Sequence, residues 1–287
     1  AVGRNALGDN TGATNTAVGT DALGSNSTAS DNTALGRKAL FSNTTGTSNV
    51  AVGETAMLLN VSGNQNTAVG RESLSANTAS DNTAIGRRAL KANTSGTQNT
   101  AVGSGALDAN TTASNNTAVG DLAASALTTG AANVAIGTNA LAASTTGARN
   151  TIVGVDSSNQ ITSGADNTAM GYDSLTRCTT GGNNVAIGKD AGDNITGGSS
   201  NTCVGLDAGT NITQGDNNIC IGNDAKTSGE AAGNCIAIGI GFNCVGSNSF
   251  SFGKSSNVVS NDFDANASWA RSSDINKKTN IENTDLG

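Results

Sequence analysis

The sequence of 287 residues contains no histidine, no proline and very few aromatic residues (Trp 1, Tyr 1, Phe 5). The absence of histidine excludes imidazole general-base catalysis, Ser-His-Asp triads and histidine-ligated metal sites. Hydrophobic residues make up 36% of the chain, against roughly 45–50% in a typical globular domain, so an ordinary globular core is not expected. Only 13% of the residues are charged and the apolar residues recur at fixed intervals, which does not fit a disordered chain.

Basic residues are also in the minority, and the formal net charge is -7. Nucleic-acid binding needs a basic face and aromatic side chains for stacking, so we expect no nucleic-acid partner. No run approaches about 18 apolar residues and residues 1–4 lack the features of a signal peptide, so we expect no membrane insertion. Because residue 1 is not Met and lies inside a repeat, we interpret the sequence as a piece of a longer protein.

A block related to Asn-Thr-Ala-Val-Gly recurs along most of the chain in steps of 17 residues, with two steps of 16 and a last step of 14. Its final glycines are Gly3, Gly19, Gly36, Gly53, Gly70, Gly86, Gly103, Gly120, Gly137, Gly154, Gly171, Gly188, Gly205, Gly222, Gly239 and Gly253. Such regularity indicates a solenoid, and a 17-residue unit is too short for a helical hairpin. We predict an all-β parallel β-roll or β-helix of sixteen coils, each with two short strands and two turns, about 75 Å long at about 4.8 Å per coil.

Two columns of the repeat are expected to point in opposite directions, because side chains alternate along a strand. A small residue such as Ala17 stands two positions before each glycine, and an aliphatic residue such as Val18 stands one position before it. One column can line the coil interior while the other packs against a neighbouring chain, and alanine permits close approach around a shared axis. A single roll of this composition buries little apolar surface, so the pattern predicts an elongated homotrimer rather than an isolated monomer.

Two further positions are assigned structural roles. We expect the strand-ending glycines to have positive φ, and the asparagines four residues earlier to stack into an amide ladder that fixes the register. These residues include Asn15, Asn32, Asn49, Asn66, Asn82, Asn99 and Asn116 with Gly19, Gly36, Gly53 and Gly70. Early coils carry Leu four residues after the glycine, whereas several later coils carry the apolar residue seven after it, which indicates two repeat subtypes.

The repeat resembles the head repeats of trimeric autotransporter adhesins, which carry an Asn-x-Ala-Ile-Gly block like residues 184–188. It is even more similar to the shaft repeats of bacteriophage tail fibres. Residues 272–282 are similar to the opening of the intramolecular chaperone that ends phage fibres and endosialidases, which reads Ser-Asp-x-Arg-Leu-Lys-x-x-Ile. The residues that match are Ser273, Asp274, Lys278 and Ile281, while Asn276 and Lys277 replace the Arg-Leu pair.

This resemblance implies a domain that helps three chains assemble and then releases itself by cutting before the serine. Carried across, Ser273 is the nucleophile of the self-cleavage and Lys278 is its partner. The chain is then divided into a repetitive shaft over residues 1–253, a neck over 254–272 and the beginning of a truncated chaperone over 273–287.

One corner of the coil carries charged residues that suggest ligands. Five consecutive later coils have an aspartate two residues after the glycine, at Asp156, Asp173, Asp190, Asp207 and Asp224. Carboxylates about 5 Å apart repel unless they are hydrogen-bonded or met by cations. A calcium stripe is one interpretation, and aspartates that accept backbone N–H groups at the turns are the one that we favour. Arg37, Lys38, Arg71, Arg87 and Arg88 stand at the same corner earlier, as a solvated corner or as a site for an anionic surface glycan.

The cysteines are confined to the later coils, at Cys178, Cys203, Cys220, Cys235 and Cys244. We expect buried free thiols that act as small apolar fillers, with disulfides in an extracellular rod as the alternative. No Cys-x-x-Cys pattern occurs, so no zinc site and no cofactor are predicted.

From the repeats and the resemblance we hypothesise a structural and adhesive protein, the distal shaft of a trimeric phage tail fibre, located in the virion or outside the cell. Its expected partners are its own copies, other tail or fibre proteins, and a glycan or protein receptor on a bacterial surface. The alternative is a trimeric bacterial surface adhesin or surface-filament head. A polysaccharide-degrading β-helix enzyme is disfavoured, because it needs paired acids in a groove. Apart from self-cleavage, no enzymatic activity is expected.

Overall fold

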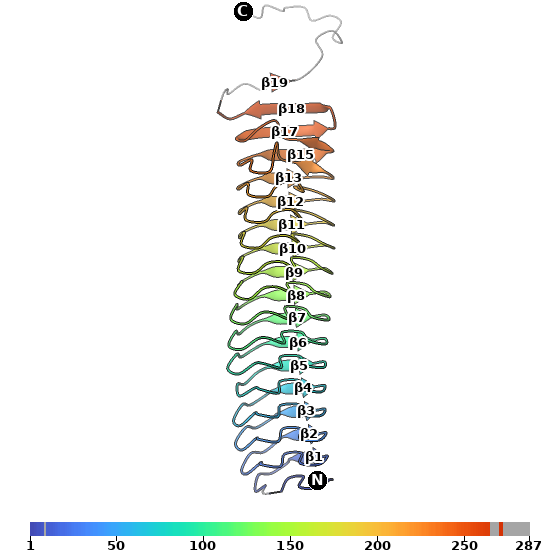
Figure 1. Ribbon diagram of the computed structural model, residues 1–287, viewed down its shortest axis with the longest axis vertical. Helices are drawn as coiled ribbons and strands as arrows, with labels where there is room; N and C mark the ends of the chain where they lie inside the picture. The colour runs from blue at the N-terminus through green and yellow to red at the C-terminus, as the bar shows by residue number, and fades with distance from the viewer. Residues whose placement is uncertain (9, 265–269, 272–287) are drawn as a thin grey trace, which may run out of the picture.

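The chain winds into a straight rod of stacked coils (Figure 1). The structure, a computed structural model, describes residues 1–8, 10–264 and 270–271. Over these residues it is an all-β parallel solenoid without helices, with about 14 turns spaced by about 17 residues. At about 4.8 Å per turn, the sheet is roughly 70 Å long. The predicted all-β parallel solenoid and its repeat length are confirmed.

Each coil adds one short strand to a single parallel sheet. The strands are β1 (Thr16–Val18), β2 (Thr33–Leu35), β3 (Val50–Val52), β4 (Thr67–Val69), β5 (Thr83–Ile85), β6 (Thr100–Val102), β7 (Thr117–Val119), β8 (Val134–Ile136), β9 (Thr151–Val153), β10 (Thr168–Met170), β11 (Val185–Ile187), β12 (Thr202–Val204), β13 (Ile219–Ile221), β15 (Ile236–Ile240) and β17 (Ser249–Lys254). Neighbours pair in register, so that Ala17 lies beside Ala34. An isolated bridge between Val2 and Val18 continues the parallel pairing at the N-terminal end.

The rest of each coil is a series of turns, so the prediction of two strands per coil is wrong for most of the rod. The exception is near the C-terminal end, where β14 (Ala225–Lys226) pairs with β16 (Phe242–Asn243). The backbone explains the difference, because residues two and four positions after the glycine have left-handed conformations, as at Asp21 (φ 59°) and Leu23 (φ 50°). A left-handed residue at every second position bends the chain instead of extending it.

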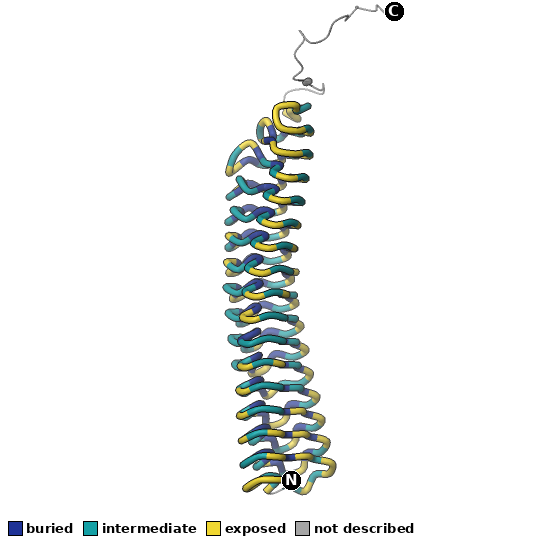
Figure 2. The backbone as a smooth tube through the Cα atoms, turned by 90° about the vertical axis from the view of Figure 1, so that its right-hand side faces the viewer, coloured by how far each residue is buried: buried dark blue, intermediate teal, exposed yellow. Residues whose placement is uncertain are grey.

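Buried residues recur in every coil (dark blue in Figure 2), and their side chains fill the interior of the rod. The residue two positions before each strand-ending glycine is fully buried, from Ala17 to Ala237. The alanine column therefore lines the coil's own interior, and the expectation that it approaches an axis shared between chains is wrong. Residues three, four and seven positions after the glycine complete the interior, such as Ala22, Leu23 and Asn26, all fully buried.

The predicted asparagine ladder is confirmed. The side-chain carbonyl of Asn15 accepts the backbone N–H of Asn32 at 2.9 Å, and the same bond recurs coil by coil up to Cys235, whose N–H donates to Asn218 at 3.0 Å. The amide of Asn32 also donates to the carbonyl of Gly46 at 2.9 Å. These bonds satisfy buried backbone groups in every turn and fix each coil on the next.

A second asparagine ladder stands seven positions after the glycine in the early coils, and the sequence pattern did not lead us to predict it. The amide of Asn43 donates to the side-chain carbonyl of Asn26 at 2.9 Å, and that of Asn60 donates to Asn43 at 3.2 Å. The ladder ends at Asn110, whose buried side-chain oxygen has no hydrogen-bond partner. The next coil has Leu127 at this position, which cannot donate a hydrogen bond.

The strand-ending glycines have positive φ, as predicted. Gly36 has φ +134°, and a Cβ placed on it would lie 2.6 Å from the carbonyl oxygen of Gly53 in the next coil. Both the backbone conformation and the close approach therefore exclude larger residues at this position.

The C-terminal end of the rod leaves the parallel pattern. β17 pairs in parallel with β15 on one side and antiparallel with β18 (Asn257–Asp262) on the other. β18 in turn pairs with β19 (Ala270–Arg271). The segment expected to be a neck thus begins as a hairpin that covers the last coil. Ser273 and Lys278, together with the rest of 272–287, lie outside the described residues.

Candidate functional site

The largest candidate surface is the outward side of the parallel sheet. The residue before each glycine points outward here, in a column formed by Val18, Leu35, Val52, Val69, Ile85, Val102, Val119, Ile136, Val153, Met170, Ile187, Val204, Ile221, Ile238 and Phe252. Its exposed members range from 37% exposure at Val18 to 47% at Leu35. Two positions earlier in each strand stands a parallel column of Thr, Val, Ile or Phe residues. We call these two columns, from β1 to β17, the outer sheet face.

The outer sheet face contains no charged residue along its whole length. In soluble monomers, apolar patches are rarely larger than a few hundred Å², and larger ones commonly mark association surfaces. The face is not needed to complete the interior of the rod, which the chain already fills. Its arrangement is therefore typical of a surface that another molecule covers.

In the early part of the charged corner, Arg37, Arg71 and Lys91 pair with glutamates of the same or of a neighbouring coil. Arg37 pairs with Glu54, while Arg71 lies 2.8 Å from Glu72, and the ammonium of Lys91 also lies 2.8 Å from Glu72. The Arg37 guanidinium lowers the pKa of Glu54, and the hydrogen bond from Lys91 lowers that of Glu72. These residues form a chain of alternating charges, while Lys38 lies over the ring of Phe41 and Arg87 is exposed.

The later part of the corner is acidic. The predicted aspartates have positive φ at every position: Asp156, Asp173, Asp190, Asp207 and Asp224. Aspartate tolerates this conformation better than most residues, which accounts for its presence. Three of these carboxylates pair with side chains instead of the backbone N–H groups that we favoured. Asp156 accepts from Asn139 at 2.9 Å, Asp190 accepts from Lys189, and Asp224 pairs with Lys226. Burial and the charges of Asp156 and Asp190 raise the pKa of Asp173.

The described residues contain no group of three or more His, Cys, Asp or Glu side chains arranged to hold a metal ion. The aspartates therefore follow one another along the rod without converging on a common centre. The calcium interpretation gains no support from this part of the chain.

The cysteines divide into two groups. Cys178, Cys203 and Cys220 are free and buried, which agrees with the prediction, and burial raises the pKa of the Cys178 thiol to about 12. Cys235 and Cys244 form a disulfide, so the prediction of free thiols is wrong for this pair. The Cys178 thiol is therefore an inert filler at neutral pH, because the thiolate is the reactive form.

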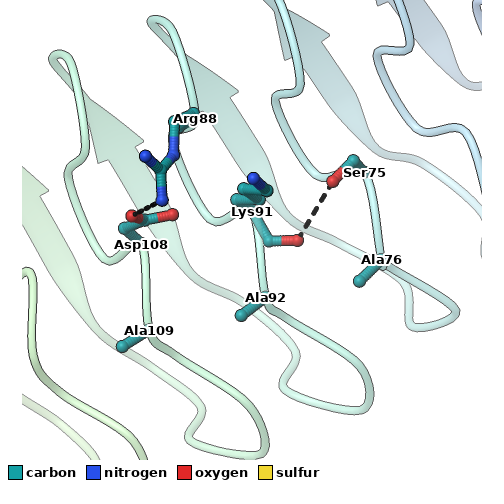
Figure 3. Close-up of a pocket in the computed structure, with 7 residues that line it drawn as sticks. All are labelled: Ser75, Ala76, Arg88, Lys91, Ala92, Asp108 and Ala109. Atoms are coloured by element: carbon teal, nitrogen blue, oxygen red, sulfur yellow. Dashed lines mark hydrogen bonds and ion pairs between the residues drawn. The ribbon is translucent and has the colours of Figure 1, made fainter.

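A hollow opens on the turn side of the rod, away from the strands (Figure 3). Its volume is about 390 Å³, and the residues that line it are Ser75, Ala76, Arg88, Lys91, Ala92, Asp108 and Ala109. We call it the alanine-floored hollow. A second hollow of about 490 Å³ near the N-terminal end is lined by Asn5, Gly8, Asp21, Gly24, Lys38 and Phe41. The sequence predicted the basic residues of the corner but neither hollow, because small residues in the turns give no periodic signal of their own.

A scan against protein-family models finds no matching family, and searches of curated proteins and of solved structures find no match. Within the described residues, no helical segment is long and apolar enough to cross a lipid bilayer. The geometry of the rod therefore carries the functional argument.

Proposed function

We propose that the protein is a structural and adhesive fibre protein, the shaft of a homotrimeric viral tail fibre that supports attachment to a host surface. The observation that carries this proposal is the outer sheet face, which runs unbroken from β1 to β17 and is left uncovered by a rod whose interior is already full. The role is mechanical, since a rod with one apolar face both extends and associates.

The strict repeat makes association of identical copies straightforward. Each coil presents outward side chains at the same two positions, so two parallel copies match coil for coil at a spacing of about 4.8 Å. Chains arranged around an axis parallel to the rods keep this register and cover the outer sheet face of every copy. The number three comes from the resemblance of the repeats to those of phage fibres and trimeric adhesins.

The size of the outer sheet face suits a stable assembly. A stable interface buries about 800 Å² on each partner. Nine of the fifteen outward side chains have roughly two-fifths of their surface exposed and the other six are half-buried, so that they offer an area of this order together with the column of Thr and β-branched residues beside them. The alanine-rich interior buries little apolar surface per coil, so the assembly supplies burial that the single chain lacks.

The assignment to a viral fibre rests on the resemblance of residues 272–282 to the opening of a fibre chaperone. A trimeric bacterial surface adhesin shares the shaft pattern but not this segment. Attachment to a bacterial glycan or protein, and contact with other tail proteins, follow from the same resemblance.

Light scattering tests the assembly directly. We expect the purified chain to have three times its 28.0 kDa mass. Changing Ile85, Val102 and Val119 together to lysine places three charges on the outer sheet face of consecutive coils and is expected to lower this mass. The control changes Ser95, Thr112 and Thr129, which are exposed turn residues of the same coils, to lysine as well. This control is expected to keep the mass of the parent assembly. A parent chain with the mass of one copy contradicts the proposal.

A further inference from the structure

We infer that the alanine-floored hollow binds a carboxylate-bearing saccharide. The inference deepens the proposed attachment function by naming a ligand class, and the site is complete within one chain. It rests on two features of the hollow: an apolar floor, and two cations beside it that keep hydrogen-bond donors for a ligand.

The floor is built by the repeat. Ala76, Ala92 and Ala109 stand at the sixth position after the glycine in three successive coils and lie in a row (Figure 3). Their methyl groups follow one another at about 4.8 Å, which makes a flat apolar strip. In the preceding coil the same position holds Leu59, a large side chain that is 51% exposed. The strip is shaped for the C–H face of a ring-sized polar molecule, since ligand sites combine an apolar lining with a few placed polar groups.

The cations stand beside this floor on one coil. A terminal nitrogen of Arg88 donates to Asp108 at 2.7 Å, and Lys91 pairs with Glu72 at 2.8 Å. The Nε of Arg88 is buried and has no hydrogen-bond partner. An arginine has five N–H donors and a lysine has three, so both residues keep donors for a further acceptor after these pairs are made.

These positions suit one kind of ligand. A carboxylate can accept from the free donors of Arg88 and Lys91, and such charge-assisted bonds are the stronger kind. A neighbouring hydroxyl can donate to Asp108, while the C–H face of the ring covers the alanines. A sugar acid carries all three features on one ring, whereas inorganic phosphate has no apolar face and a neutral hexose has no carboxylate.

The hollow also remains open in the proposed assembly. All seven of its lining residues lie in the turns, outside the strands that form the outer sheet face. Covering that face with other copies leaves the hollow accessible on each chain. Three equivalent sites on one fibre raise the overall affinity for a polysaccharide above that of a single site.

The test is a titration of the full chain with D-galacturonate, with methyl galactoside and inorganic phosphate as comparison ligands, followed by NMR or calorimetry. We expect saturable binding of the uronate and binding at least about tenfold weaker for the other two ligands. Arg88→Gln is expected to weaken uronate binding about tenfold. Arg87→Gln is the matched control, because Arg87 is an exposed neighbour outside the lining, and it is expected to bind like the parent.

A second pair of variants tests the space over the alanine floor without changing any charge. Ala92→Leu fills the floor and is expected to abolish uronate binding, while Ala126→Leu makes the same change in the same column outside the lining and leaves binding unchanged. Equal binding of phosphate and uronate, or full binding by Ala92→Leu, overturns the inference, as does the absence of uronate binding. Light scattering on the same samples measures assembly separately. A failure of uronate binding is therefore distinguishable from a failure of the fibre proposal.

Discussion

The early and late coils fill the same interior in two different ways. In the early coils a large apolar residue stands four positions after the glycine and an asparagine stands seven after it, as with Leu40 and Asn43. In two of the later coils the fourth position is glycine and the seventh is isoleucine, with Gly192 and Ile195 in one and Gly209 and Ile212 in the other. The interior has a fixed cross-section, and proteins pack their interiors densely. The combined volume of the two side chains is therefore constrained, while the size of either side chain alone can vary.

The surface changes in parallel with the interior. Charges alternate along the early corner, where Glu54 and Glu72 meet basic partners, whereas carboxylates predominate along the later corner around Asp173. The same backbone thus carries one set of interior and corner side chains in the early coils and another set in the late coils.

The largest effect is expected from exchanging the interior pair. A Cβ on Gly192 would lie 3.0 Å from the terminal carbon of Ile195, so Gly192→Leu overpacks the coil and is expected to cost about 2–3 kcal/mol. The backbone itself accepts the change, because Leu175 has the same left-handed conformation one coil earlier. Adding Ile195→Asn recreates the early pair and is expected to restore about 1–3 kcal/mol relative to the sum of the single changes. Urea unfolding of the four proteins measures this coupling, and additive costs would contradict the paired-position account.

A smaller difference in stability is expected at the seventh position after the glycine, where the early coils carry asparagine and later coils carry other residues. Asn60→Ala removes bonds to Gly63 at 3.0 Å and to Asn43 at 3.2 Å and is expected to cost about 2 kcal/mol. Ser144 occupies the same position in a later coil, and its buried hydroxyl has no partner. Ser144→Ala is therefore expected to be neutral or slightly stabilising. Thermal unfolding compares the two variants, and equal losses would show that the ladder bonds are not the cause.

The smallest effect is a pH dependence of opposite sign in the two regions. The pKa of Glu72 is lowered by Lys91, so its contribution is present above the pKa of the unfolded carboxyl, about 4.3, and is lost as the pH falls. The pKa of Asp173 is raised by burial and neighbouring carboxylates, so its stabilising protonation is lost as the pH rises through the folded value. Near neutral pH, Glu72→Gln should destabilise and Asp173→Asn should stabilise, each by less than about 1 kcal/mol.

Both differences should vanish in acid, where the carboxyl groups are protonated in the folded and unfolded states alike. Unfolding midpoints measured across the pH range for the parent and both variants check the signs. A shift in the same direction for both variants near neutral pH would contradict the contrast between the two corners.

The sequence was enough to predict the solenoid, because glycines such as Gly36 must fall where coils approach closely, and this requirement repeats with the coil. The ladder through Asn15 and Asn32 was predictable for the same reason, since one buried bond recurs in every turn. The left-handed conformation of Leu23 was not, because leucine has no local preference for it and the stacking of coils imposes it.

Pairings between side chains were harder to predict. Arg37 and Glu54 are 17 residues apart, so the period brings them to adjacent coils, but only the geometry of the corner shows that their charges meet. The disulfide between Cys235 and Cys244 forms where the period shortens, so the repeat no longer indicates which residues are neighbours. The alanine-floored hollow depends on small residues whose significance lies in the space they leave.

The most direct test of the homotrimeric rod is its mass per unit length, measured by small-angle scattering or scanning transmission microscopy. We expect three chains side by side, hence three 17-residue coils for each rise of about 4.8 Å. A value of one coil per rise would contradict it, since the outer sheet face would then remain uncovered along the whole rod.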